Sequence, residues 1–438
     1  MRVAVTLPSI DRRALVARQL DAVVRALAER VDIEVFVEST RLRGGDLPAP
    51  AFHYLRFDER HRHAAFDTAL YPLGRDFLPY EPSYLLAGRF AGVAWILDPA
   101  MHHMLVGGLA LLGRWDAYIE ALAATVPTLG ARVAATVAAG WGTRALYDHY
   151  DPVARAMSLR HRMMAATAPI AAGLQRQGVA VEHVELPIAA GVLGTPAQHG
   201  ETPSVVAVIS ASSRWPLPLM SGLARLLEKR PDLSIRYVTP EVIHQVVAGP
   251  AASRAGLDGR IVWHLSPSPA ELLRVTDGAE VVIAVAPEPV AYERGLLYRA
   301  LAAGALTLVA DAPHYDFLPR DIAPRLTPGR AVGDALFVTI DSLLDDPPLV
   351  AALRHAGRRL VAAGPEATAI ASTVEVELER ARELSPTPVR RAASTWELLR
   401  GRLQRRCVPS NATDAARQLI RERLANVAPC VVGITADP

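Results

Sequence analysis

Short β-branched runs alternate with longer helix-patterned segments over most of the chain. This alternation is typical of α/β proteins, in which helices cover both faces of a parallel sheet. In the first half the pattern predicts strands at 3–7, 33–37, 66–71 and 93–97, a helix at 11–28, and Ala-rich helices over most of 101–177.

The second half repeats the pattern more regularly. It predicts strands at 205–209, 234–238, 261–264, 281–285 and 307–310, and helices at 217–227, 270–275, 294–303, 332–344, 348–363 and 367–384. A stretch rich in Gly, Pro and polar residues at 189–203 separates the halves, and Pro and Ser break the pattern again at 385–388.

These breaks predict three parts. The first two are doubly wound, Rossmann-like domains at 1–190 and 204–384, and the third is a tail at 385–438 with two amphipathic helices at 395–406 and 413–426. We expect the two domains to face a central cleft and to bind a ligand where the carboxyl ends of their sheets meet.

Composition limits the class of ligand. The chain has 438 residues, is 51% hydrophobic and carries a formal net charge of +2, which excludes a disordered chain and disfavours a basic nucleic-acid binder. Lys229 is the only lysine, so the cations are almost all arginines. GC-rich coding accounts for most of these arginines, and individual ones remain candidates for binding phosphate or carboxylate.

The number of cysteines and the hydropathy pattern indicate in which cellular compartment the protein is expected. Cys407 and Cys430 are the only cysteines, and the N-terminal segment resembles a buried strand more than a signal peptide. Charged residues and proline interrupt the two most apolar stretches, at 91–113 and 117–140, so we predict no transmembrane segment. We therefore expect a cytoplasmic protein.

Two common nucleotide-binding motifs are missing. A dinucleotide site needs G-x-G-x-x-G after the first strand, whereas the only G-x-G here is Gly140-Trp141-Gly142, after an Ala-rich helical stretch. A P-loop needs a Gly-Lys pair, and the single lysine lies in a Glu-Lys-Arg-Pro context. Nicotinamide and P-loop chemistry are thus disfavoured.

Two segments of the second half carry a family resemblance. The stretch 209–216 has the form of a strand and loop ending in Ser213-Arg214-Trp215-Pro216, and the run from Tyr292 to Gly304 leads through a Gly-containing loop into a helix. Together with their surroundings at 204–360 they resemble the donor-binding domain of GT-B glycosyltransferases of the GT4 group. This resemblance implies retaining transfer of a sugar from a nucleotide sugar, with no cofactor and no required metal.

The first half adds a second match. The run from Tyr71 to Arg75, the strand end at 92–98 and the Met-His-His-Met-Leu at 101–105 are similar to a bacterial subset of that group. Order and spacing agree through both domains.

The resemblance implies roles for individual residues. On the donor side, cations and helix N-terminal amides would hold the diphosphate and sugar; the matching positions are Arg214, Ser213, Tyr292, Glu293, Arg294, Gly295, Leu296 and Arg299. Gly74 and Arg75 would lie on the acceptor side. The catalytic candidates are Asp98, which would orient an acceptor hydroxyl, and His102 and His103, of which at most one is expected to face the cleft because adjacent helical residues point apart.

Several positions depart from the family pattern. Leu97 stands in place of a histidine, Ser213 in place of a lysine, Arg75 in place of an asparagine and Phe317 in place of a glutamate. A second hypothesis is therefore a degenerate, non-catalytic subunit that supports a partner enzyme. A nucleotide-sugar epimerase shares the fold, but the matched segments favour a transferase.

The remaining features are less specific. His61-Arg62-His63 is predicted to be a solvated loop and not a metal site, because no third ligand accompanies it at a defined spacing. The donor base and sugar, the acceptor and the oligomeric state, including a homo-oligomer, are left open by the sequence.

Overall fold

We describe a computed structural model of the chain. It describes residues 1–8, 14–38, 47, 49–74, 77–98, 101–108, 115, 118–119, 122, 129–139, 146, 157–188, 205–209, 216–239, 241, 244–285, 293–312, 315–327 and 329–383. The predicted tail at 385–438 lies outside these residues.

The N-terminal domain is built on a parallel sheet in the order β3-β2-β1-β4-β5-β6-β7. Its strands are β1 (Arg2–Thr6), β2 (Asp32–Val37), β3 (Ala51–His53), β4 (Thr68–Leu73), β5 (Val93–Ile96), β6 (Arg162–Ala165) and β7 (Val181–His183). Its helices include α1 (Leu15–Ala28), the 3₁₀ turn η1 (Tyr54–Arg56), α3 (Phe57–His63), α4 (Phe77–Ala87), α5 (His102–Gly108), α7 (Gly130–Ala138) and α10 (Ala168–Arg176).

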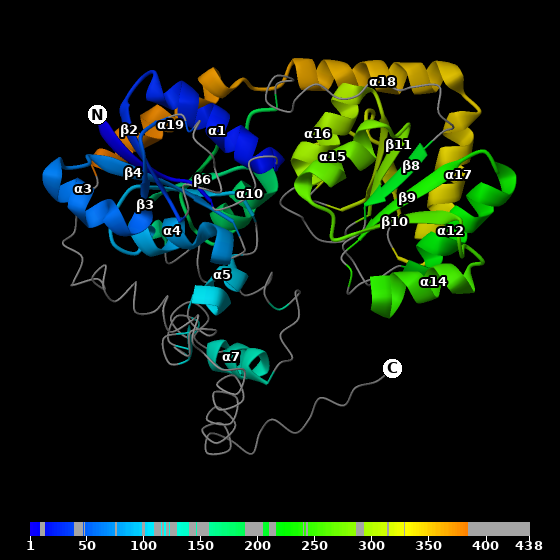
Figure 1. Ribbon diagram of the computed structural model, residues 1–438, viewed down its shortest axis with the longest axis horizontal. Coiled ribbons are helices and arrows are strands. Elements are labelled where there is room, and N and C mark those ends of the chain that lie inside the picture. Colours follow the sequence, from blue (N-terminus) through cyan, green and yellow to red (C-terminus); the bar gives the residue numbers. More distant parts are fainter. Residues whose placement is uncertain are drawn as a thin grey trace.

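The C-terminal domain repeats this plan, with a parallel sheet in the order β10-β9-β8-β11-β12-β13 (Figure 1). Its strands are β8 (Val205–Ile209), β9 (Ser234–Thr239), β10 (Ile261–Leu265), β11 (Val281–Ala284), β12 (Leu306–Ala310) and β13 (Arg325–Leu326). Its helices include α12 (Pro216–Lys229), the π-helical turn η3 (His244–Ala248), α14 (Gly249–Arg254), α15 (Pro269–Asp277), α16 (Glu293–Ala303), α17 (Val332–Leu344) and α18 (Pro347–Ala362). The strand order reverses between β1 and β4, and again between β8 and β11, as in doubly wound folds.

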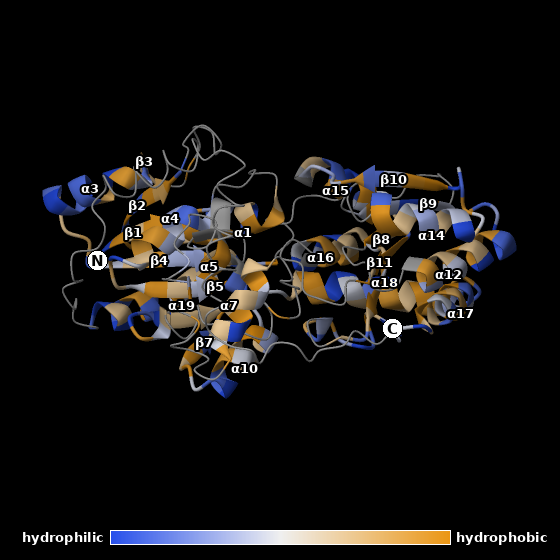
Figure 2. Cartoon of the chain, turned by 90° about the horizontal axis from the view of Figure 1, so that it is seen from below, coloured by the Kyte–Doolittle hydropathy of each residue, from blue (hydrophilic) through white to orange (hydrophobic). Residues whose placement is uncertain are grey.

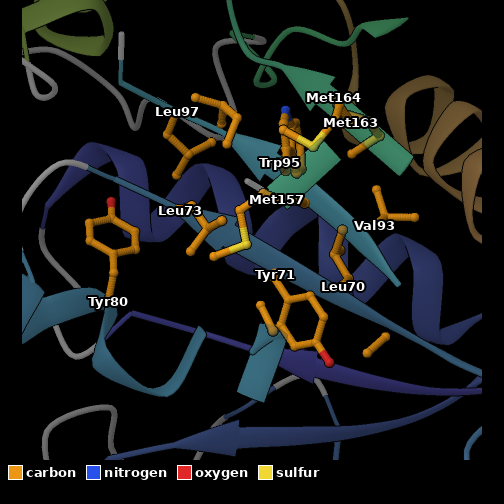
Figure 3. Close-up of a cluster of buried hydrophobic side chains, with 14 of the residues drawn as sticks. Leu70, Tyr71, Leu73, Tyr80, Val93, Trp95, Leu97, Met157, Met163 and Met164 are labelled. Atoms are coloured by element: carbon orange, nitrogen blue, oxygen red, sulfur yellow. The ribbon is translucent and has the colours of Figure 1, made fainter. Parts of the chain in front are cut away.

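The central strands are largely apolar because helices cover both faces of the sheets. All residues of β4 and β12 are buried. Figure 3 shows the resulting core of the N-terminal domain, in which Trp95 of β5 lies beside Met163 and Met164 of β6. The outer helix α3 is in contrast largely hydrophilic (Figure 2).

Two local predictions are wrong. The segment around His61 is helix α3 and not a loop: Asp58 and Glu59 lie in its first turn and basic side chains in its last, where they complement the helix dipole. The predicted helical span 101–177 contains strand β6, whose Arg-Met-Met-Ala sequence lacks the β-branched residues that mark most strands.

The last described helix packs on the N-terminal domain, although it lies within the predicted range 204–384. Helix α19 (Ala367–Arg382) packs on α1, and its side chains Ile370, Val374 and Leu378 belong to the N-terminal core. Figure 1 shows this orange helix among the blue elements of the N-terminal domain. The chain therefore crosses back after α18. No helix in the described part of the chain is long and apolar enough to cross a membrane.

His161, just before β6, gives the fold a predicted acid sensitivity. Its Nε2 lies 3.0 Å from the Ala87 carbonyl, and burial lowers the pKa of His161 to about 4. The unfolded chain, with an ordinary histidine pKa of about 6.5, binds the proton first, so stability is expected to fall as the pH drops from about 6.5 to 4, by up to about 3 kcal/mol. Urea unfolding across this range measures the slope. His161→Phe should flatten it, and an unchanged slope in that variant would assign the effect to other groups.

Candidate functional site

Two residues predicted to lie at the site, Gly74 and Asp98, lie at the carboxyl edge of the N-terminal sheet. Gly74 follows β4 directly and Asp98 lies two residues after β5, and these two strands are neighbours. Asp98 is 2% exposed. Because both chain segments leave the sheet at the same edge, the structure brings together an acceptor-side residue and a catalytic candidate that the sequence predicted.

The side chains behind this edge are tightly packed. A Cβ added at Gly74 would clash with the ring of Tyr80 on α4, so only glycine allows this approach. Ser83 of the same helix lies 2.7 Å, Oγ to Oγ1, from Thr6 at the end of β1. Helix α4 is thereby fixed against the sheet where β1 and β4 diverge.

His102 begins helix α5 close to Asp98 in the sequence. It is fully buried, and its Nε2 lies 2.7 Å from the Tyr118 hydroxyl. The Trp115 ring packs edge-on against Tyr118 with centroids 5.7 Å apart. His103 is the next residue of α5, and its side chain lies outside the described part of the structure.

Tyr118 is the residue that sequence reasoning missed. It is separated from His102 by 16 positions, and no motif links the two. The one available signal is an aromatic pair, Trp115 and Tyr118, at helical spacing inside an Ala-rich stretch.

The start of α16 lies at the same edge. Arg294 donates from Nη1 to the Ala166 carbonyl at 2.7 Å and from Nη2 to Glu185 at 2.6 Å. Ala166 follows β6, and β6 pairs with β5. Helix α16 therefore begins beside the carboxyl edge of the N-terminal sheet, although it belongs to the C-terminal domain.

The two residues that follow Arg294, Gly295 and Leu296, are also tightly packed. A Cβ added at Gly295 would lie 3.0 Å from Leu15 Cβ of α1, which is a close approach between the domains. Leu296 is fully buried. The sequence assigned the backbone amides of Arg294, Gly295 and Leu296 to a phosphate cradle, and that role stays a prediction; the guanidinium of Arg294 is bound to the N-terminal domain.

Arg299, a donor-side candidate whose role stays a prediction, forms an ion pair within the C-terminal domain. Its Nε and Nη2 each donate to Asp277 at 2.6 Å, and its side chain is buried. This bidentate pair joins α16 to the end of α15, so Arg299 stabilises the C-terminal domain in this structure. Glu293 begins α16, and its side chain is not among those described. Arg75, Ser213, Arg214 and Tyr292 lie outside the described residues.

The structure describes the contacts of two positions that depart from the family pattern, Leu97 and Phe317. Leu97 is a buried member of the apolar cluster drawn in Figure 3. Phe317 packs on Tyr298 with ring centroids 5.4 Å apart and lies 4.7 Å, centroid to Cζ, from Arg294. Both positions serve packing. Among the described residues, no group of three or more His, Cys, Asp or Glu side chains is arranged to hold a metal ion.

A scan against protein-family models and a search of curated proteins both find no match. HepE from Anabaena, in complex with UDP and glucose, is similar over 87% of this chain and 100% of that chain, with TM-score 0.56 and 12% identity. The chain has the GT-B fold.

Other solved structures agree with this fold. Sucrose-phosphate synthase from Thermosynechococcus elongatus matches over 87% of this chain and 98% of that chain, with TM-score 0.53 and 13% identity. A glycosyltransferase from Rickettsia africae covers the same shares with TM-score 0.53 and 10% identity. The predicted fold class is therefore confirmed.

The Tyr118 contact gives a prediction. Tyr118→Phe removes the hydrogen bond to His102 and is expected to cost about 1 kcal/mol of stability. Tyr71→Phe is the matched comparison, because the Tyr71 hydroxyl is bonded to the Phe90 carbonyl at 2.9 Å within the core, and a similar loss is expected there. Urea unfolding measures both losses. Unchanged stability in Tyr118→Phe would show that the contact with His102 does not stabilise the fold.

Proposed function

We propose that this protein is a glycosyltransferase that moves a sugar from a nucleotide-sugar donor to an acceptor, with retention of configuration and without a required metal. The observation that carries the proposal is the meeting of α16 with the edge that holds Gly74 and Asp98, in a chain of GT-B fold. A helix N-terminus offers unpaired amides and a positive dipole end, which suit a diphosphate.

The two domains have separate tasks in this proposal. The C-terminal domain binds the nucleotide sugar, with the amides of Arg294, Gly295 and Leu296 and the side chain of Arg214 stabilising the negative charge of the departing diphosphate. The N-terminal domain binds the acceptor, and Asp98 orients the acceptor hydroxyl towards the anomeric carbon. The new glycosidic bond forms at that carbon on the face from which the diphosphate leaves, the bond to the diphosphate breaks, and the hydroxyl proton passes to the departing diphosphate. HepE, which has a similar fold, is described in complex with UDP and glucose, and this supports a nucleotide-sugar donor.

A turnover assay tests this function. The full chain is incubated with UDP-, GDP- and dTDP-sugars and a panel of glycan, lipid and small-molecule acceptors, with and without EDTA. We expect release of free nucleotide with one donor class, an unchanged rate in EDTA, and the donor's anomeric configuration in the product by NMR. Metal-dependent turnover or an inverted product would refute the corresponding part of the proposal.

A second candidate function is a non-catalytic, GT-B-like subunit that supports a partner enzyme. Two observations favour it: Leu97 is in the core where the family pattern has a histidine, and Arg294 is bound to Glu185. This candidate predicts that an active enzyme co-purifies with the chain and speeds up when more chain is added. Turnover by the isolated chain would eliminate it.

A further inference from the structure

Arg294 connects the two domains through two acceptors that are themselves fixed in the N-terminal sheet. The Ala166 amide donates to the Ile96 carbonyl at 2.9 Å, which extends the pairing of β6 with β5. Val184, the residue before Glu185, makes two hydrogen bonds with the sheet. Its amide donates to the Ala165 carbonyl at 2.9 Å, and its carbonyl accepts from Trp95 Nε1 at 3.0 Å. The guanidinium therefore meets a rigid pair of acceptors.

The C-terminal domain holds the same guanidinium in place. Its Cζ lies 4.7 Å from the Phe317 ring centroid and 5.7 Å from the Tyr298 ring centroid. The Arg294 side chain is 15% exposed and that of Glu185 30% exposed, so the pair is partly desolvated. Partial desolvation strengthens a charge-assisted hydrogen bond beyond that of an exposed pair.

Further contacts of α1 and of the segment 184–188 lie close to the pair of Arg294 and Glu185. Leu15 of α1 lies against Gly295, and Gln19 of α1 donates to the Pro187 carbonyl at 2.9 Å. The Ile188 amide donates to the Pro365 carbonyl at 3.3 Å, where the chain returns from α18 to α19. The segment 184–188 thus lies between α1 and the returning chain.

The ion pair has no equivalent elsewhere in the described structure. If α19 is counted with the N-terminal domain on which it packs, Arg294 and Glu185 form the one ion pair among the described residues that joins the two domains. The other described pairs lie within a domain, as Arg320 and Asp311 do at 2.7 Å.

We propose that Arg294 and Glu185 form an interdomain latch that holds the start of α16 against the carboxyl edge of the N-terminal sheet. In this role Arg294 and Glu185 are positioning residues: they set where the amides of α16 lie relative to Asp98. The consequence for sugar transfer rests on the proposed function, whereas the latch itself does not.

The test is a double-mutant cycle on the full chain without ligand, with Arg294→Met, Glu185→Ala and the double variant. Hydrogen exchange is measured for 162–188 and 293–303, and small-angle X-ray scattering gives the radius of gyration. We expect each single variant to speed exchange in both segments by roughly tenfold and to increase the radius of gyration, with little further change in the double variant.

Asp311→Asn provides the matched control, because it breaks an exposed ion pair inside one domain. It should leave the exchange of 162–188 and the radius of gyration unchanged. Additive effects of the two single substitutions, or faster exchange confined to the mutated segment, would overturn the latch. If the protein transfers sugar, Glu185→Ala should lower kcat more than it raises KM for the donor, which loss of general stability would not do. An inactive protein with a coupled cycle would refute the proposed function and leave the latch standing.

Discussion

Asp98→Asn is expected to slow sugar transfer by about 10²- to 10⁴-fold, the range typical of losing a positioned acid–base group. Asp98 leaves the sheet two residues after β5 and is almost fully buried. Asparagine has nearly the same shape but lacks the negative charge that would orient and polarise an acceptor hydroxyl. The loss should therefore appear mainly in kcat.

Asp67→Asn is the matched control for this experiment. Asp67 is exposed, accepts from the Arg2 amide at 2.7 Å, and precedes β4 at the opposite, amino edge of the same sheet. Rates and thermal unfolding are measured for both variants. A rate in Asp98→Asn within a factor of about three of the unsubstituted protein, with folding intact, would remove Asp98 from the mechanism.

Trp95→Ala is expected to destabilise the N-terminal domain by about 3–5 kcal/mol. Trp95 is fully buried between neighbouring strands, and its indole nitrogen binds the Val184 carbonyl at 3.0 Å. Alanine leaves a cavity in the core and frees the segment that carries Glu185. Denaturant unfolding followed by circular dichroism measures the loss.

Trp95→Phe distinguishes the cavity from the lost hydrogen bond to Val184 as the cause of the destabilisation. It keeps most of the ring volume and loses the hydrogen bond, so it should cost about 1–2 kcal/mol while still loosening the segment 184–188 in hydrogen exchange. If Trp95→Phe were as destabilising as Trp95→Ala, the cavity would not be the main cause of the loss.

Much of the fold could be predicted from the sequence because its central strands are continuous apolar runs. The central strands of both sheets follow from that pattern, with strands such as 205–209 predicted at their observed bounds. Strand β6 was missed because methionines and alanine fill it and tertiary packing decides its conformation. Helix α19 was predicted as a helix, but its return to the N-terminal core depends on contacts with residues more than 200 positions away, such as Arg162 with Glu377.

The candidate site was predictable only where residues follow a strand end. Gly74 and Asp98 belong to this class, since parallel strands bring their carboxyl ends to one edge. The partners of Arg294 were not predictable, because Glu185 and Ala166 are 109 and 128 positions away and carry no motif. The same holds for Asp277, which binds Arg299 from another helix. Side-chain pairing across elements is set by packing, which periodicity does not encode.

Isothermal titration calorimetry with UDP, GDP and dTDP tests directly whether this GT-B protein binds a nucleotide-sugar donor, as proposed. We predict saturable heat with one of the three nucleotides, at one site per chain. The absence of heat and of any thermal shift with all three at millimolar concentration would contradict the account.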